Sequence, residues 1–172
     1  MVSIHTDGSC YPNPGPGGWA AIVHGLGSYE HVLRGWDAQT TNNRMELMGP
    51  IVALEHVFSH ELYSGQAVMV VSDSQYVVNG ITKWVHGWVR KGWKTAEGRE
   101  VLNRDLWERL MAQAGSGQPL LGVVARPVAW TWIKGHNAHP VNERCDALAV
   151  GARTTRTTST VVTPYAEVGH AR

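Results

Sequence analysis

The alternation of apolar and polar residues predicts three strands at the start of the chain. Val2–Asp7 alternates apolar with polar side chains, which is typical of a strand that buries one face. A Pro/Gly-rich loop covers residues 12–18, and two further strand patterns follow at Trp19–Gly25 and Tyr29–Asp37. Because the connections are short, we expect the three strands to form an antiparallel meander.

Helical spacing of the apolar residues replaces this alternation after residue 40. Residues 40–43 are helix-capping types, so we expect a helix over Asn43–Glu61. Proline has no N–H and crowds the preceding turn, so Gly49–Pro50 is expected to bend this helix. The compact apolar run Ala67–Ser72 then favours a strand that is buried on both faces.

The remaining pattern predicts several helices and one more strand. The helices are expected at Ser74–Thr82, Trp84–Lys91, Val101–Ala114 and Pro140–Arg153, and the strand at Val123–Lys134, where Pro127 favours a sheet edge or a bulge. This order of elements predicts an α/β fold, a mixed sheet with helices on both faces. We interpret residues 1–153 as one domain and the Thr-rich residues 154–172 as a loosely held tail.

Composition narrows the cellular context more than the activity. The 172 residues carry a formal net charge of +1, so charge alone neither favours nor excludes a nucleic-acid partner. Two cysteines make no disulfide framework, which favours a reducing, cytoplasmic location. No apolar run approaches about 18 residues, and a strand pattern follows Met1 directly. We therefore expect a cytoplasmic monomer without a membrane span or a signal peptide.

Four acidic residues stand at positions where ligands gather in α/β proteins. Asp7 and Asp73 end predicted strands, Glu46 lies one turn into the first long helix, and Asp146 lies near the start of the last helix. If the strands of Asp7 and Asp73 are parallel neighbours, their carboxylates emerge side by side at the carboxyl end of the sheet. Each acid alone has an ordinary alternative role, as a helix cap or a solvated side chain. Spacing by itself does not show that the four meet.

The chemistry of such a cluster favours hard divalent cations. Neighbouring carboxylates repel and raise one another's pKa, so bound cations would stabilise them. Oxygen ligands without Cys or His favour Mg²⁺ or Mn²⁺. Two such ions about 4 Å apart can stabilise the attacking and leaving oxygens of a phosphoryl transfer.

The segment Lys83–Lys94 combines four cations and three tryptophans with no acid. Basic side chains supply affinity for phosphates, and flat aromatic rings can lie against sugars or bases. The alternative is a solvated helix whose tryptophans anchor it to a core, and Trp93 is expected to be such an anchor. The segment is therefore a candidate surface for nucleic acid.

Seven short motifs occur in order along the chain. They are TDGS at Thr6–Ser9, NPGPGG at Asn13–Gly18, TNNRMEL at Thr41–Leu47, SDSQYV at Ser72–Val77, GITKW at Gly80–Trp84, GWKT at Gly92–Thr95 and KGHNAHPVNERCDALA at Lys134–Ala149. Together they resemble the type 1 ribonuclease H family of bacteria and eukaryotes. The resemblance implies the ribonuclease H-like fold, a five-stranded mixed sheet flanked by helices. It also implies an endoribonuclease that cuts the RNA strand of RNA–DNA hybrids and leaves 5′-phosphate and 3′-hydroxyl ends.

The resemblance also assigns roles to individual residues. It implies that two Mg²⁺ ions, or Mn²⁺, bind with the hybrid and that His136 moves a proton or assists product release. The implied metal ligands are Asp7, Glu46, Asp73 and Asp146. The implied hybrid contacts are Trp84 and Trp88 to deoxyribose, Thr41 and Asn103 to DNA phosphate, Asn42 and Gln75 in the minor groove, and Asn13 in the loop beside the site.

Other interpretations remain open at this point. The chain could be a hybrid-binding module that has lost catalysis, the ribonuclease H domain of a reverse transcriptase, or a transposase-type relative. His56 and His60 are four residues apart and could share a metal ion, but the sequence suggests no third ligand. The ordinary interpretation of this pair is two histidines on a helix surface.

Overall fold

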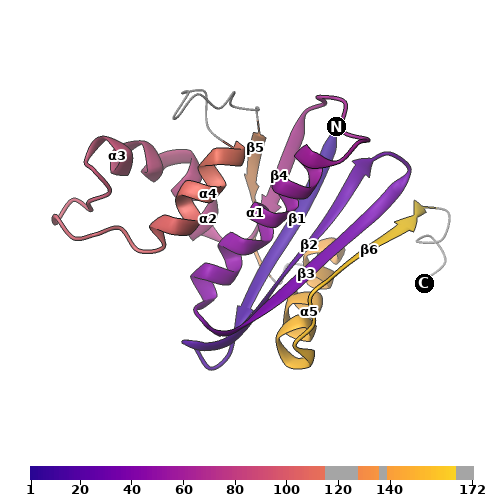
Figure 1. Ribbon diagram of the computed structural model, residues 1–172, viewed down its shortest axis with the longest axis horizontal. Helices are drawn as coiled ribbons and strands as arrows, with labels where there is room; N and C mark the ends of the chain where they lie inside the picture. Colours follow the sequence, from indigo (N-terminus) through magenta and orange to yellow (C-terminus); the bar gives the residue numbers. More distant parts are fainter. Residues whose placement is uncertain (115–127, 136–138, 166–172) are drawn as a thin grey trace.

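The computed structural model describes residues 1–114, 128–135 and 139–165, and these form one twisted sheet with helices on both faces (Figure 1). The strand order is β5-β4-β1-β2-β3-β6. The strands are β1 (Val2–Cys10), β2 (Gly15–Leu26), β3 (Tyr29–Thr40), β4 (Val68–Ser72), β5 (Val128–Trp132) and β6 (Ser159–Pro164). The predicted α/β class, with a mixed sheet, is confirmed.

The first three strands form the expected antiparallel meander. β1 pairs with β2 from Ser3 to Cys10, and a tight turn joins β2 to β3, with Leu26 opposite Tyr29. Gly27 lies in that turn with φ of +67°, a backbone conformation that favours glycine. The meander therefore supplies a rigid antiparallel half to which the parallel strands attach.

The parallel half of the sheet determines where the strand ends meet. β4 is parallel to both β1 and β5, and Thr6 of β1 lies opposite Ser72 of β4. The connection from β3 to β4 runs through the long helix α1 (Asn42–Ser59). Because β1 and β4 run in the same direction, their carboxyl ends lie at the same edge of the sheet.

The other helices follow in the predicted order, with different boundaries. They are α2 (Gln75–Asn79), the π-helical segment η1 (Gly80–Trp84), α3 (Val85–Arg90), α4 (Arg104–Ala114) and α5 (Pro140–Thr155). The two separate helices expected between residues 74 and 91 form one uninterrupted helical run through η1. Val123–Pro127 of the predicted strand lies outside the described residues, and β5 forms one edge of the sheet.

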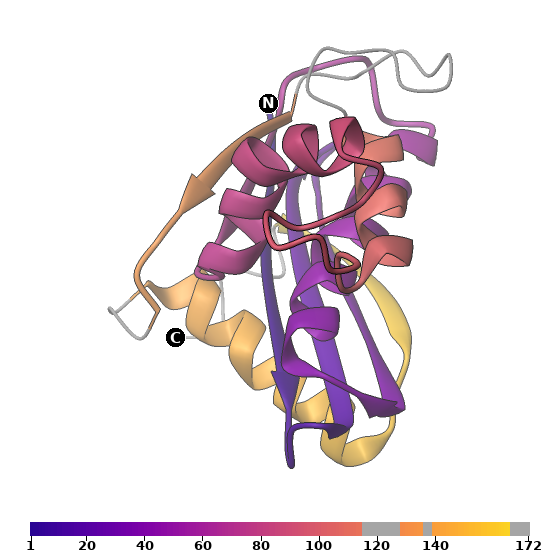
Figure 2. The ribbon, with the colours of Figure 1, turned by 90° about the vertical axis from the view of Figure 1, so that its left-hand side faces the viewer.

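Two apolar clusters bury the two faces of the sheet, as Figure 2 shows with α1 and α5 on opposite sides. The larger cluster joins α1 and α4 to strand residues such as Ile4 and Val23, and the smaller one joins Ile22 and Val32 to α5. Adjacent strand residues face opposite ways, so Ile22 and Val23 belong to different clusters. Among the described helices, none combines the length and hydrophobicity needed to cross a membrane.

The Gly49–Pro50 pair lies inside α1 and is buried. A Cβ atom on Gly49 would lie 3.2 Å from the Ala20 carbonyl oxygen and 3.2 Å from the Cβ atom of Thr6. Glycine therefore allows α1 to approach β1 and β2 closely, which explains why a weak helix former stands here. The helix continues through Pro50 to Ser59, and the expected bend stays a prediction.

The Thr-rich tail differs from the prediction. Ser159–Pro164 forms β6, which pairs antiparallel with β3, so the sheet has six strands and not five. The expectation of a loosely held tail is wrong for this segment. Thr and Val have high β-propensity, and the edge of β3 offers unpaired N–H and C=O groups. The Arg34 side chain also donates a 3.0 Å hydrogen bond to the Ser159 hydroxyl.

Candidate active site

Parallel pairing of β1 and β4 brings two predicted carboxylates to one edge of the sheet. Thr6 and Ser72 are the last register partners of β1 and β4, so Asp7, inside β1, and Asp73, just after β4, follow them directly. Glu46 approaches from the first turns of α1 because Gly8 leaves room: a Cβ atom on Gly8 would lie 2.4 Å from the Glu46 nitrogen. Asp146 comes from α5 on the opposite face, next to the buried Cys145.

The electrostatics show that the four carboxylates lie close together. Burial and the charge of Asp73, with smaller contributions from Asp146 and Glu46, together raise the pKa of Asp7 to about 8, against the opposing hydrogen bond from the Gly8 amide. Burial also raises the pKa of Glu46, with a contribution from Asp73. A site in which neighbouring carboxylates disfavour the charged forms of Asp7 and Glu46 is one that a cation would stabilise.

Hydrogen bonds hold two of these carboxylates in place, and two of the donors were missed by the sequence prediction. The Ser74 hydroxyl donates a short hydrogen bond to Glu46. The Asn142 amide donates to Asp73 Oδ2 at 3.1 Å, while its own Oδ1 is buried without a partner. Ser74 is an N-cap residue type directly after a buried strand, and Asn142 lies one helical turn before Asp146. Both sequence positions therefore indicated a polar side chain near the acids.

The predicted contacts near the first helix take more local roles. Asn42 donates a 2.8 Å hydrogen bond to Glu46 Oε1, so it orients a carboxylate. Asn13 accepts a 3.2 Å bond from the Asn42 backbone amide and is exposed. Thr41 is the N-cap of α1, where its hydroxyl accepts from the Arg44 amide. His136 lies outside the described residues.

The tryptophans of the basic segment divide into exposed and buried members. Trp84 is 40% exposed, whereas Trp93 is buried in the core cluster, as expected of an anchor. Trp88 lies between these extremes: it packs against the core and meets the Trp107 ring edge to face, at 5.4 Å between ring centroids. The segment therefore combines the two predicted alternatives, a surface for nucleic acid and a helix anchored to the core by tryptophan. Trp84 is the ring of this segment that is most available to a ligand.

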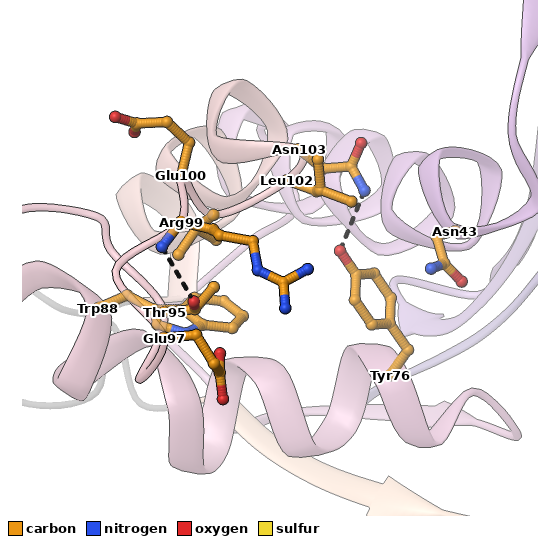
Figure 3. Close-up of a pocket in the computed structure, with 10 residues that line it drawn as sticks. Asn43, Tyr76, Trp88, Thr95, Glu97, Arg99, Glu100, Leu102 and Asn103 are labelled. Atoms are coloured by element: carbon orange, nitrogen blue, oxygen red, sulfur yellow. Dashed lines mark hydrogen bonds between the residues drawn. The ribbon is translucent and has the colours of Figure 1, made fainter.

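A hollow of about 590 Å³ opens between α1, α2, α3 and the loop before α4 (Figure 3). Asn103 forms part of its wall, and its amide donates to the Tyr76 hydroxyl at 3.0 Å and accepts from the Arg44 guanidinium at 3.3 Å. Arg44 in turn pairs with Asp105 at 2.7 Å. The Asn103 side-chain amide has a second N–H that these two bonds do not use. This donor suits the predicted contact with a DNA phosphate.

A second, smaller hollow of about 390 Å³ lies between α2 and the edge strand β5. Gln75, Lys83 and Trp132 are among its lining residues, and the Trp132 indole donates to the Asp73 carbonyl at 2.9 Å. This hollow links the predicted contact Gln75 to the carboxylate edge. The described site therefore has an acidic centre with hollows and exposed aromatic and basic side chains on the α2–α4 side.

Comparison with known proteins agrees with this geometry. The RNase H family model matches residues 1–154. A ribonuclease H of Xanthomonas campestris pv. campestris is 49% identical over 148 residues, which cover 86% of this chain and 89% of the relative. LC9-RNase H1, described as a type 1 RNase H with the type 2 active-site motif, has a TM-score of 0.77 and 32% identity, covering 99% of this chain and 81% of that structure.

One further solved structure shares the fold at lower identity. LC11-RNase H1 in complex with an RNA/DNA hybrid has a TM-score of 0.60 at 21% identity, covering 90% of this chain and 98% of that one. The family match covers the elements from β1 through nearly all of α5 and includes the positions of the four acids. The chain therefore belongs to the ribonuclease H family.

Proposed function

We propose that this protein hydrolyses the RNA strand of RNA–DNA hybrids with two Mg²⁺ ions, or Mn²⁺, held by Asp7, Glu46, Asp73 and Asp146. The products would carry 5′-phosphate and 3′-hydroxyl ends. The observation that carries the proposal is the convergence of these acids in a partly buried site, where burial first and then the charges of the other three raise the pKa of Asp7 to about 8. A cluster that is unfavourable without cations is a suitable site for them.

The donor set fits hard divalent ions. The four side chains offer oxygen atoms only, and carboxylate oxygens are the ligands that Mg²⁺ and Mn²⁺ prefer. When bound, two such ions would activate a water molecule and stabilise the charge that develops on the scissile phosphate. Because the pKa of Asp7 is raised, this side chain must release a proton when an ion binds near neutral pH.

The chain's own groups account for the choice of the RNA strand. The A-like groove of a hybrid presents 2′-hydroxyls on one strand only. Glu46 and the main chain of 8–10 are proposed to bond such hydroxyls, and the 2.8 Å hydrogen bond from Asn42 holds the Glu46 carboxylate in place. A DNA strand would leave these groups without partners, which is costly in a partly buried site.

Trp84 and Trp88 are expected to respond differently to truncation. Trp84→Ala removes an exposed ring and should weaken hybrid binding by roughly 1–3 kcal/mol, the range for stacking contacts, with little change in Tm. Trp88→Ala should weaken binding and also lower Tm, because Trp88 packs on Trp107. Hybrid affinity in Ca²⁺ and thermal melting measure the two effects, and unchanged affinity in Trp84→Ala would contradict the assignment.

Ser74 and Asn142 are expected to act through the carboxylates that they hold. Outer-shell partners of metal ligands typically contribute about 10–100-fold in metal affinity or activity. Ser74→Ala and Asn142→Ala should therefore raise the Mg²⁺ concentration needed for half-maximal cleavage by about this factor. Ser64→Ala, in a loop away from the acids, is the matched control. An unchanged Mg²⁺ dependence in both variants would assign them a purely structural role.

A cleavage assay tests the function itself. End-labelled hybrid, RNA duplex, DNA duplex and single-stranded RNA would each be incubated with the protein, with and without Mg²⁺. The proposal expects cutting of the hybrid's RNA strand alone, and only with the ion. Hybrid binding in Ca²⁺ without any cutting in Mg²⁺ would instead support the alternative of a non-catalytic binding module.

The remaining expectations stay predictions of the same proposal. Residues 1–153 are proposed as the catalytic domain, with β6 as an accessory strand. Removing residues 159–172 should preserve cleavage but lower Tm, because it exposes the edge of β3. Loss of cleavage in a folded truncated chain would place the domain boundary beyond β6. Proton transfer by His136, the monomeric state and the cytoplasmic location are further predictions.

A further inference from the structure

Three histidines meet at the end of α1 that is remote from the carboxylates. His56 lies in the last turn of α1, His60 caps that helix, and His31 comes from β3 beneath it. One ring nitrogen of each lies within 4.8 Å of one from each of the others, and the ring centroids are 5.0 to 5.3 Å apart. The sequence shows only the pair on the helix, and the fold supplies the third member.

The buried member of this group, the histidine trio, has unmet hydrogen-bonding capacity. His31 is 1% exposed, and its Nδ1 lies 3.0 Å from His56 Nε2, so the two rings share at most one proton along this contact. The Nε2 atom of His31 is buried and meets no group at hydrogen-bonding geometry, although the Leu26 main chain lies close enough to the ring to act on its pKa. His56 and His60 are only partly buried, which leaves an approach from solvent to the nitrogens.

The surroundings of His31 and His56 favour the neutral rings, which keep a lone pair for a metal ion. Burial lowers the pKa of His56 to about 4, with contributions from His31 and His60. Burial and His60 also lower the pKa of His31, against an opposing effect of the Leu26 main chain. The nearest acid on α1, Glu55, is bound by Arg109 at 2.6 Å. None of the ion pairs in the described part of the chain includes a histidine of the trio.

We propose that His31, His56 and His60 form a binding site for a borderline transition-metal ion such as Zn²⁺, which would tie the end of α1 to β3. Imidazole nitrogens suit Zn²⁺, Cu²⁺ and Ni²⁺, whereas Mg²⁺ prefers oxygen. Three protein ligands leave a fourth position for water in a tetrahedral Zn²⁺ site.

This site is separate from the catalytic one and does not depend on it. Ten residues of α1 separate Glu46 from His56, which corresponds to about 15 Å along a helix axis. One local bond would change on metal binding: His60 Nδ1 accepts from the Leu62 amide at 3.2 Å. That amide lies near the surface, where water can replace the acceptor at little cost.

Zinc titration of the metal-stripped full-length chain tests the site, with excess Mg²⁺ present to occupy the carboxylates. Calorimetry should find one Zn²⁺ per chain in the wild type at neutral pH. His56→Gln and His60→Gln keep polar side chains at partly exposed positions and should each weaken Zn²⁺ binding by roughly 100-fold or more, since even outer-shell changes reach this range. At a free Zn²⁺ concentration of 100 times Kd, the Tm of the wild type should rise by about 5–10 °C.

Matched variants separate the trio from other zinc ligands. His86→Gln removes a histidine from α3 and should keep wild-type Zn²⁺ affinity, as should Asp7→Asn. Co²⁺ in place of Zn²⁺ should give visible absorption bands that the His56→Gln and His60→Gln variants lack. Absence of Zn²⁺ binding in the folded wild type would overturn the proposal. Equal affinity in the wild type and both histidine variants, or a loss confined to Asp7→Asn, would overturn it too.

Discussion

Replacing Asp7 by asparagine is expected to abolish hybrid cleavage while leaving the metal-free protein at least as stable as the wild type near neutral pH. Asparagine keeps the shape of the side chain and an oxygen that can accept the Gly8 amide bond, which is 2.7 Å long in the wild type. It removes the charge that Asp73, Asp146 and Glu46 all oppose. Catalysis loses a proposed metal ligand, whereas the fold loses a source of repulsion.

The direction of the stability change follows from proton linkage. The pKa of Asp7 is about 8 in the folded chain against an ordinary value of 3.8, so the folded state binds more protons than the unfolded state between these values. Stability of the metal-free wild type should therefore fall as pH rises through this window, by about 1.4 kcal/mol for each unit of pKa difference that persists in solution. Asp7→Asn should remove most of this fall.

Melting temperatures in EDTA at about pH 5 and about pH 8 measure the effect, alongside cleavage in Mg²⁺. Mg²⁺ should raise the Tm of the wild type more at the higher pH, where the acids are ionised, and should raise that of Asp7→Asn less. Glu61→Gln, an exposed carboxylate beyond the end of α1, is the charge-matched control. Near-wild-type cleavage by Asp7→Asn would refute the role of Asp7 as a metal ligand.

The acid cluster could be predicted from the sequence because its geometry follows from strand direction. Asp7 and Asp73 each end a predicted strand, and only parallel pairing of β1 with β4 was needed to join them. Once the antiparallel meander is recognised, and α1 is seen to connect β3 to β4, the short connections favour parallel pairing of β4 with β1. The motifs supplied Glu46 and Asp146, whose positions on helices of opposite faces do not follow from spacing.

Contacts between distant residues could not be predicted in the same way. Asn142 and Asp73 are 69 positions apart, and only the packing of α5 brings them together. The histidine trio likewise joins β3 to α1, and His31 and His56 are 25 positions apart. β6 was missed because a Thr-rich segment has no strong apolar pattern, and its pairing depends on the free edge of β3. Tertiary context decides such elements, as it generally does for strands.

The packing of Gly80 against Trp107 connects the fold of the basic segment to its proposed hybrid-binding face. A Cβ atom on Gly80 would lie 2.0 Å from Cη2 of Trp107 and 2.6 Å from Cζ2. Trp107 is fully buried, its indole donates to the Tyr76 hydroxyl at 3.1 Å, and its ring contacts that of Trp88. The ring therefore has little freedom to move away.

Gly80→Ala is therefore expected to destabilise the protein by about 3 kcal/mol or more, at the upper end of the range for overpacked cores. The backbone at Gly80 is right-handed helical, so the cost comes from the clash and not from strain at this residue. Gly87→Ala is the matched control: a Cβ there meets nothing within 4 Å, and alanine in a helix should stabilise by about 0.5–1 kcal/mol.

Displaced Trp107 should also shift Trp88, so hybrid affinity in Ca²⁺ should fall in folded Gly80→Ala and stay unchanged in Gly87→Ala. Adding Trp107→Phe, which shortens the clashing ring, should make the two losses in stability less than additive. Urea unfolding of the wild type, Gly80→Ala, Trp107→Phe, the double variant and the control Gly87→Ala measures these terms. Equal stability of Gly80→Ala and Gly87→Ala would show that η1 can move away from α4 without cost.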